Sequence, residues 1–351
     1  MPNIDEIKLS KELIRFPSIT PVDAGAIKFL SKKLKSIGFK CKILEFKNKK
    51  NKPIKNLYAR IGTQQPNICY AGHTDVVPPG DYKDWSTNPF KPIIKNNHLI
   101  GRGANDMKSS IACFASAASR YLKNNPKFKG SISFLITGDE EGLAINGTKK
   151  VVDYLKKKRE KLNFCIVGEP TNPTKLGEMI KIGRRGSLSG TIEILGTQGH
   201  VAYPHLSNNP INTLIAICQK LKKTKLDKGN KNFQPSNLEF TSITVDNKAH
   251  NVIPSRAKSN FNIRYNNIHT AVSLKNKINK ILKAICKKNK CSFKVTYEVS
   301  GDAFLTKPEK TIYMAKKIIK KITGINTKFS TTGGTSDARF IKKISPCFEF
   351  G

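Results

Sequence analysis

The sequence of 351 residues lacks several features by which whole classes of protein are identified. No stretch approaches the roughly 18 to 20 consecutive apolar residues of a membrane-spanning helix. The N-terminus has no basic region followed by an apolar one, so no signal peptide is predicted. The eight cysteines include no C-x-x-C pair, and we interpret them as reduced, structural thiols. These absences predict a cytoplasmic protein with no membrane partner.

Arginine is scarce, although the formal net charge is +38. Only ten of the 63 basic residues are arginine, and the lysines are spread along the chain, often beside Asn and Ile, as at 47–52. A nucleic-acid-binding groove tends to cluster arginine with aromatic residues. We therefore interpret the charge as surface composition and expect no nucleic-acid partner, although the positive field can attract an anionic substrate. Nucleic-acid binding stays an alternative, and an affinity for DNA that depends steeply on salt concentration would support it.

The first half of the chain alternates strand-like and helix-like segments, which predicts an α/β sheet flanked by helices. Apolar strand-like runs lie at 40–46, 55–60, 66–71, 131–137 and 162–167, and helical periodicity at 4–16, 23–37, 107–124 and 147–158. Beyond residue 178 the pattern changes to longer alternating strands at 178–196 and 238–264, with helices at 210–223 and 271–289. We expect an inserted α+β domain at 179–292, between the two parts of a catalytic domain at 1–178 and 293–351.

Acidic and imidazole side chains follow three of the predicted strands directly. His73 follows the run 68–72, Glu140 and Glu141 follow 134–137, and Glu169 follows 164–167. Ligands bind beyond the carboxyl ends of strands in open α/β sheets, so these groups meet at one edge if the strands are neighbours. Asp106 opens a helix after two glycines, at 101 and 103. One imidazole with several carboxylates is the ligand set of a hydrolytic zinc site.

Each of these signals has a simpler explanation when it is taken alone. His73 with Asp75 is more often a satisfied polar pair, and Asp106 alone indicates a helix N-cap. Adjacent acidic residues such as Glu140 and Glu141 are most often a solvated loop or the first turn of a helix. Glu169 before proline is typical of a turn. Their conjunction, each after a strand-like run, favours the metal site.

Six motifs together resemble the dinuclear zinc aminoacylase/carboxypeptidase metallopeptidase family over essentially the whole chain. Three match the family's metal-binding motifs: Ala71–Pro78, Gly101–Lys108 and Asp139–Gly142. Three others are similar to the branch that removes succinyl groups from diaminopimelate: Gly183–Ser187, Gly199–His205 and Gly333–Phe340. Asn105 stands where that pattern has alanine. The resemblance implies a zinc-peptidase-like mixed sheet flanked by helices, with an inserted lid and dimerisation domain.

The resemblance also implies two Zn²⁺ (or Co²⁺) ions per subunit and a role for each residue of the metal motifs. His73 and Glu169 would bind one ion and Glu141 the other, with Asp106 bridging both. Asp75 would accept a hydrogen bond from the far nitrogen of His73, and Glu140 would be the general base. A homodimer is implied as well, because His200 of the partner subunit would stabilise the oxyanion.

The reaction that the resemblance implies is hydrolysis of N-succinyl-LL-2,6-diaminopimelate to succinate and LL-diaminopimelate, on the bacterial route to lysine. The implied substrate contacts are Arg184, Ser187, Tyr203, Asn251, Arg264, Gly334 and Thr335. Without the resemblance, Arg184 indicates a solvated strand edge and Arg264 a cross-strand pair. The alternatives are a related deacylase acting on acetylornithine, a dipeptidase, or an inactive dimer-forming homologue.

The last residues, Phe348–Gly351, match a strand of the family that ends in Glu-Phe-Gly, and the second zinc's histidine would follow that strand. No histidine follows His269 in this sequence. We therefore expect one metal ion to be held well and the second weakly or not at all, and we expect an impaired chain with apolar sheet surface exposed.

Overall fold

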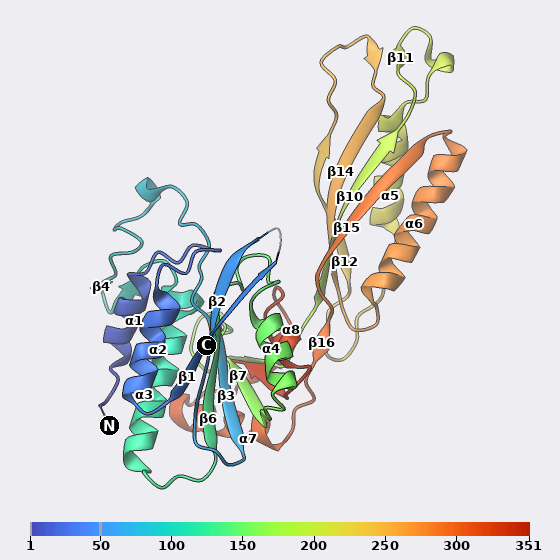
Figure 1. Cartoon of the computed structure of the whole chain (residues 1–351). Coiled ribbons are helices and arrows are strands. Elements are labelled where there is room, and N and C mark those ends of the chain that lie inside the picture. The colour runs from blue at the N-terminus through green and yellow to red at the C-terminus, as the bar shows by residue number, and fades with distance from the viewer. Residues whose placement is uncertain (1, 49–50) are drawn as a thin grey trace. The chain divides into compact units, whose positions relative to one another are not determined.

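The structure, a computed structural model, describes residues 2–48 and 51–351 and forms two compact units (Figure 1). The first unit comprises the chain up to Ile182 together with Thr306–Ser330 and Ser336–Gly351. The second unit comprises Gly183–Leu305 and Thr331–Thr335. Within the described ranges, no helix has the length and apolar character needed to cross a membrane.

The first unit is built on an eight-stranded mixed sheet with the order β1-β2-β6-β3-β7-β18-β8-β17. Its strands are β1 (Lys40–Asn48), β2 (Asn51–Ile61), β3 (Asn67–His73), β6 (Ser131–Thr137), β7 (Phe164–Val167), β8 (Met179–Lys181), β17 (Lys328–Ser330) and β18 (Cys347–Glu349). The central strands β6, β3, β7 and β18 run parallel to their neighbours in this group. They are short and largely buried, as strands covered on both faces are expected to be.

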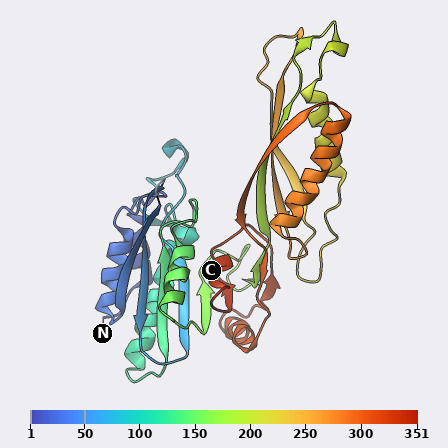
Figure 2. The ribbon, with the colours of Figure 1, turned by 45° about the vertical axis from the view of Figure 1, so that its right-hand side comes forward.

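Helices cover both faces of this sheet (Figures 1 and 2). They are α1 (Glu6–Ile14), α2 (Ala26–Ser36), α3 (Ser109–Asn124), α4 (Thr148–Lys157), α7 (Lys310–Thr323) and α8 (Ala338–Ile341). The unit also contains the short helical turns η1 (Tyr82–Asp84) and η2 (Ala104–Lys108) and a hairpin of β4 (Ile93–Lys95) and β5 (His98–Ile100). Apolar residues at helical spacing, such as Leu9 with Leu13 and Leu30 with Leu34, pack into one core with Leu57 of β2. The predicted α/β sheet flanked by helices is confirmed.

The second unit is a four-stranded antiparallel sheet with two helices packed on it. The sheet has the order β12-β14-β10-β15, with β10 (Gly186–Leu195), β12 (Asn237–Thr244), β14 (Arg256–Tyr265) and β15 (Ser292–Gly301). The helices are α5 (Pro210–Lys223) and α6 (Ala271–Lys288). Smaller elements are β9 (Gly183–Arg184), β11 (Gly199–His200), η3 (Pro204–Leu206), β13 (Val252–Ile253) and β16 (Phe304–Leu305).

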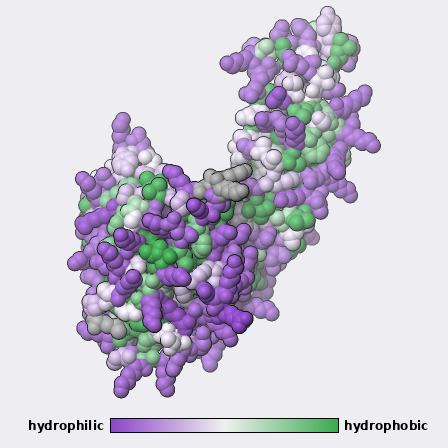
Figure 3. Space-filling view, in the orientation of Figure 1, coloured by the Kyte–Doolittle hydropathy of each residue, from purple (hydrophilic) through white to green (hydrophobic). Residues whose placement is uncertain are grey.

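The unit boundaries differ from the predicted domain limits of 178/179 and 292/293. The strand β15 pairs with β10 along its length, so the second unit continues to Leu305. This pairing packs Phe293, Val295 and Tyr297 against the core of the second unit. Thr331–Thr335 also belongs to the second unit, and there the hydroxyl of Thr331 donates to the main-chain oxygen of Asn232. Figure 3 shows hydrophilic side chains over most of the visible face of each unit.

Candidate metal centre

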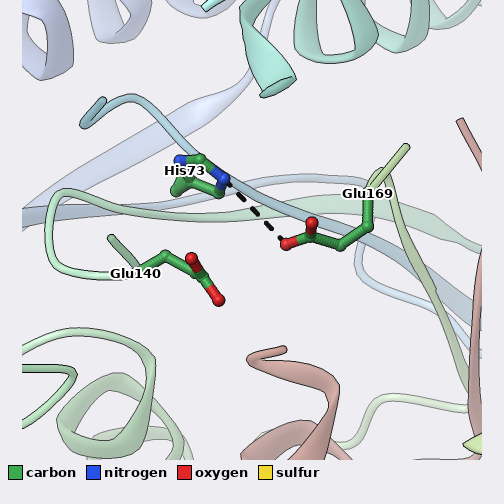
Figure 4. A group of neighbouring side chains, drawn as sticks. All are labelled: His73, Glu140 and Glu169. Carbon is green, nitrogen blue, oxygen red and sulfur yellow. Dashed lines mark ion pairs between the residues drawn. The ribbon is translucent and has the colours of Figure 1, made fainter. Parts of the chain in front are cut away.

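Three neighbouring parallel strands of the first unit deliver the predicted ligands to one edge of the sheet. The strand β3 pairs in parallel with β6 on one side and with β7 on the other. His73 is the last residue of β3, Glu140 and Glu141 follow β6, and Glu169 follows β7. The three strands that carry the predicted ligands are therefore neighbours, as the prediction of a metal site required. In Figure 4 the side chains of His73, Glu140 and Glu169 are directed toward one space.

The imidazole of His73 is the centre of this group and is 1% exposed. Its Nε2 lies 3.1 Å from Oδ1 of Asp106 and 4.0 Å from Oε1 of Glu169 (Figure 4). Its Nδ1 lies 2.9 Å from the main-chain oxygen of Asp75. A carbonyl oxygen only accepts, so Nδ1 carries a proton, and in the neutral ring Nε2 keeps its lone pair for a metal ion.

Asp75 holds the site together in a different way from the one predicted. Its carboxylate was expected to orient His73, but Oδ1 lies 3.7 Å from Nδ1 and the main-chain oxygen takes the hydrogen bond instead. The two carboxylate oxygens accept the main-chain N–H groups of Glu140, at 3.3 Å, and Glu141, at 2.9 Å. Asp75 thus fixes the end of β3 and the loop after β6 relative to each other.

Two sets of side chains bring their ligand atoms within 4.8 Å of one another. One set is His73, Glu140 and Glu169, and the other is His73, Asp106 and Glu141. Imidazole nitrogen and carboxylate oxygens suit zinc and related divalent ions. The structure therefore gathers all four predicted metal ligands, and it adds Glu140, which was predicted as the base, to one of the sets.

Charge and burial shift the protonation of this site in the metal-free chain. Burial raises the pKa of Glu140 well above its ordinary value, and the neighbouring Asp337 carboxylate raises it further. Burial lowers the pKa of His73, but the surrounding carboxylates, chiefly Asp106, outweigh it and raise that pKa well above its ordinary value. The site therefore stabilises positive charge. A metal ion that binds there displaces protons, so the metal affinity falls as the pH falls.

Two buried charged residues beside the centre were not singled out from the sequence. Asp337 is 5% exposed, and Nη2 of Arg339 lies 3.7 Å from its Oδ1. Lys108 is fully buried, its Nζ donates to the main-chain oxygen of Phe16 at 2.8 Å, and burial lowers its pKa to about 7. Lys108 lies in the motif Gly101–Lys108 and Asp337 in Gly333–Phe340, and this membership was the signal in the sequence that could have identified them.

The predicted substrate contacts lie in the second unit, in two groups. Ser187 of β10 is paired in register with Arg264 of β14. Arg184 is buried, and its Nη1 donates to the main-chain oxygen of Thr332, in the segment that also holds Gly334 and Thr335.

The other group surrounds the exposed end of β11. There the rings of His200 and Tyr203 lie 6.0 Å apart, and the main-chain oxygen of Asn251 accepts from Val201. The side chains of His200, Tyr203 and Asn251 are exposed.

Comparison with known proteins identifies the family of this architecture. Residues 69–351 match the model of peptidase family M20/M25/M40. The chain is 67% identical over 351 residues to succinyl-diaminopimelate desuccinylase of Pelagibacter ubique (strain HTCC1062), covering 100% of this chain and 91% of that protein. It is 51% identical over 349 residues to the protein of the same name in Ehrlichia canis (strain Jake), covering 99% and 90%.

Solved structures share the fold at low sequence identity. A tripeptidase from Staphylococcus aureus has a TM-score of 0.79 at 18% identity, with 100% of this chain and 91% of that chain covered. A dinuclear metal-binding peptidase of the M20 family from Bacillus subtilis has a TM-score of 0.69 at 15% identity, with 98% and 86% covered. The family model and the two relatives, which match over 99% or more of this chain, confirm the resemblance noted in the sequence: the chain belongs to peptidase family M20/M25/M40.

Proposed function

We propose that this chain hydrolyses N-succinyl-LL-2,6-diaminopimelate to succinate and LL-diaminopimelate. The observation that carries the proposal is the 67% identity, over the whole chain, to a relative named for this activity. The gathered ligand sets around His73 support a metal-dependent amide hydrolysis of this kind. The reaction would serve lysine and diaminopimelate biosynthesis. We infer a cytoplasmic location from this biosynthetic role.

Glu140 is the proposed general base. It would accept the proton of the attacking water and return it to the departing amine nitrogen. A pKa raised by burial and by Asp337 suits a carboxylate that must both take and release a proton near neutral pH. The Asp75 carboxylate holds the main chain of Glu140 in place for this transfer. Zinc or cobalt ions held by His73, Asp106, Glu141 and Glu169 would polarise the amide carbonyl and lower the pKa of water.

Substrate recognition is assigned to the second unit because its predicted contacts match a substrate that carries several carboxylates. Arg184 and Arg264 present planar guanidinium groups, which bind carboxylates with paired hydrogen bonds. Ser187 lies in register beside Arg264, and its hydroxyl accepts from Nδ2 of Asn262 at 3.1 Å. The further proposed contacts are Tyr203, Asn251, Gly334 and Thr335.

We also propose that the protein acts as a homodimer in which His200 donates a hydrogen bond to the oxyanion in the partner's site. His200 is exposed, and its Nδ1 accepts from the main-chain N–H of Ala202 at 3.1 Å. That bond leaves the proton of the neutral ring on Nε2, which is then available as a donor. The proposal is tested by mixing two inactive variants, His200→Ala and Glu140→Gln. An equal mixture should recover roughly a quarter of the activity if His200 acts across the dimer, and none if it acts within one chain.

The two metal ions are proposed to differ in affinity and to be zinc. His73 belongs to both ligand sets and is the sole imidazole in either, as far as the described chain extends. An ion held by His73, Asp106 and Glu169 has a nitrogen ligand, whereas Glu141 and Asp106 offer a second ion only oxygen. Equilibrium dialysis against zinc should therefore give one tight and one weaker site per chain. Two equally tight sites would contradict the proposal.

The assignment of function is tested by the hydrolysis of N-succinyl-LL-diaminopimelate by the zinc-loaded chain, with N-acetylornithine as the comparison. Selective cleavage of the succinyl substrate is the expected result, followed as release of succinate. Preferential cleavage of N-acetylornithine would assign a related deacylase instead. Absence of cleavage of either substrate by a zinc-loaded dimer would reject the enzymatic assignment for this chain.

A further inference from the structure

A short segment of the first unit, Phe16–Thr20, lies against the metal centre and takes no part in the proposed chemistry. It follows α1 and forms a single parallel bridge, in which Ile19 pairs with Val76. The main-chain N–H of Val76 donates to the oxygen of Ser18 at 3.0 Å, and the N–H of Thr20 donates to the oxygen of Val76 at 3.1 Å. The 16–20 segment therefore runs alongside the residues that follow β3.

Ser18 holds both chain neighbours of Asp75. Its side chain is completely buried, and Oγ donates to the main-chain oxygen of Thr74 at 2.6 Å, while its main-chain oxygen accepts from Val76. Asp75, between these two contacts, accepts from Nδ1 of His73 with its main-chain oxygen and from the loop after β6 with its carboxylate. A shift of the chain on either side of Asp75 would therefore move the imidazole and that loop as well.

Lys108 attaches the same segment to the turn that carries Asp106. Its ammonium is completely buried and donates to the main-chain oxygen of Phe16 at 2.8 Å. Its main-chain N–H donates to the oxygen of Gly103 at 2.9 Å, which closes the turn around Asp106. A buried ammonium is costly unless it is paired and hydrogen-bonded, so its position is closely determined by these partners. Lys108 thus fixes the Asp106 turn relative to the 16–20 segment.

The other end of the segment touches the loop after β6. A β-carbon added at Gly142 would lie 2.5 Å from Oγ1 of Thr20, so the Thr20 side chain lies directly against the main chain beside Glu141. The 16–20 segment therefore contacts the end of β3, the turn of Asp106 and the loop that carries Glu140 and Glu141. These three parts of the chain supply most of the proposed metal ligands.

We propose that Ser18 and Lys108 are positioning residues of the metal centre, which act through the 16–20 segment to set the spacing of its ligands. Ligands that are held in place before the ion arrives bind it more tightly, because less freedom is lost on binding. This role rests on the metal binding of the proposed function and is independent of the substrate. Neither residue has to touch the ion, since each acts on the main chain that carries the ligands.

The test is the zinc dissociation constant of the tight site in Ser18→Ala and Lys108→Met, measured by competition with a chelator of known affinity. We expect each variant to bind zinc about tenfold more weakly, within the range for residues that orient metal ligands. The absorption spectrum of the cobalt-loaded chain, which reports ligand geometry, should change in both. Lys108→Met is the decisive variant. Loss of a positive charge beside a cation site would by itself strengthen metal binding, so weaker binding must come from altered positions.

Ser131→Ala is the matched control for a general loss of stability. Ser131 is buried in the same unit, and its Oγ also donates to a main-chain oxygen at 2.6 Å, that of Gln64, but at the end of β6 remote from Glu140. Ser131→Ala should lower the free energy of unfolding of the metal-free chain, as Ser18→Ala does, and leave the zinc affinity and the cobalt spectrum unchanged.

The double variant tests whether the two residues act through one segment. Ser18→Ala combined with Lys108→Met should bind zinc little more weakly than either single variant, because each change already releases the 16–20 segment. Unchanged or tighter zinc binding in Lys108→Met, equal zinc affinity in Ser18→Ala and Ser131→Ala, or fully multiplicative losses in the double variant would overturn the inference alone. Failure of the unsubstituted chain to bind zinc would instead reject the metal centre of the proposed function, and these roles with it.

Discussion

Replacement of Glu140 by glutamine should lower kcat by about 10²- to 10⁴-fold, the range that general acid–base catalysis contributes. Glutamine matches the shape of the side chain but cannot take the proton of the attacking water. The main-chain N–H of residue 140 would still donate to Asp75, so the loop after β6 keeps its position. The measurement is kcat for N-succinyl-LL-diaminopimelate together with the zinc content of each preparation. Glu45→Gln, an exposed substitution on β1, is the matched control and should retain full activity.

The zinc content decides between two roles that the geometry allows for Glu140. Its carboxylate belongs to one of the ligand sets, with His73 and Glu169. As a base, Glu140 contributes to kcat alone, and zinc stays bound in the glutamine variant. Parallel loss of zinc and activity would instead make Glu140 a metal ligand and would leave the base to be found elsewhere, with the buried Asp337 as the next carboxylate to test.

The local pattern of the sequence was enough to predict the elements that carry the ligands. Apolar runs followed at once by His73 or Glu169 become β3 and β7, because short, fully apolar strands are stable only when covered on both faces. Residues 271–289 were predicted as a helix, and α6 spans Ala271–Lys288. The placement of β15 was not predictable in this way, because its partner, β10, is separated from it by about a hundred residues of sequence. A strand's alternation shows that it is half-buried but not which sheet it joins.

The contacts within the site depend on atomic detail that motifs do not contain. Asp75 was expected to act on His73 through its carboxylate, yet the main-chain oxygen occupies that position and frees the carboxylate to bind the loop after β6. Sequence analysis could therefore predict the residues of the metal centre, whereas the hydrogen bonds that hold them in place required the structure.

Replacement of His73 by alanine should abolish tight zinc binding and lower kcat/KM by more than about 10⁴-fold, since activation of the water depends on bound metal. In the proposed arrangement His73 supplies the nitrogen ligand of the tightly held ion, so its loss removes the tight site, whereas loss of Glu141 weakens the other ion. The measurement is zinc stoichiometry after dialysis, followed by kcat/KM for N-succinyl-LL-diaminopimelate. His98→Ala, on the exposed hairpin, is the control and should change neither.

A milder substitution at Asp75 tests the residue that holds the main chain of Glu140 and Glu141 in place. Asp75→Asn keeps the main-chain oxygen that accepts from His73 but replaces one of the carboxylate oxygens that hold Glu140 and Glu141 by an amide NH₂ group, which cannot accept. We expect zinc affinity to fall about 10- to 100-fold, the range for residues that orient metal ligands, and kcat to fall as well because the base loses its support. If Asp75→Asn weakened zinc binding and left kcat at saturating zinc unchanged, Asp75 would support metal binding and would not support the base Glu140. If His73→Ala still bound zinc tightly, the carboxylates would suffice for the metal, and the imidazole would have to act on the substrate instead.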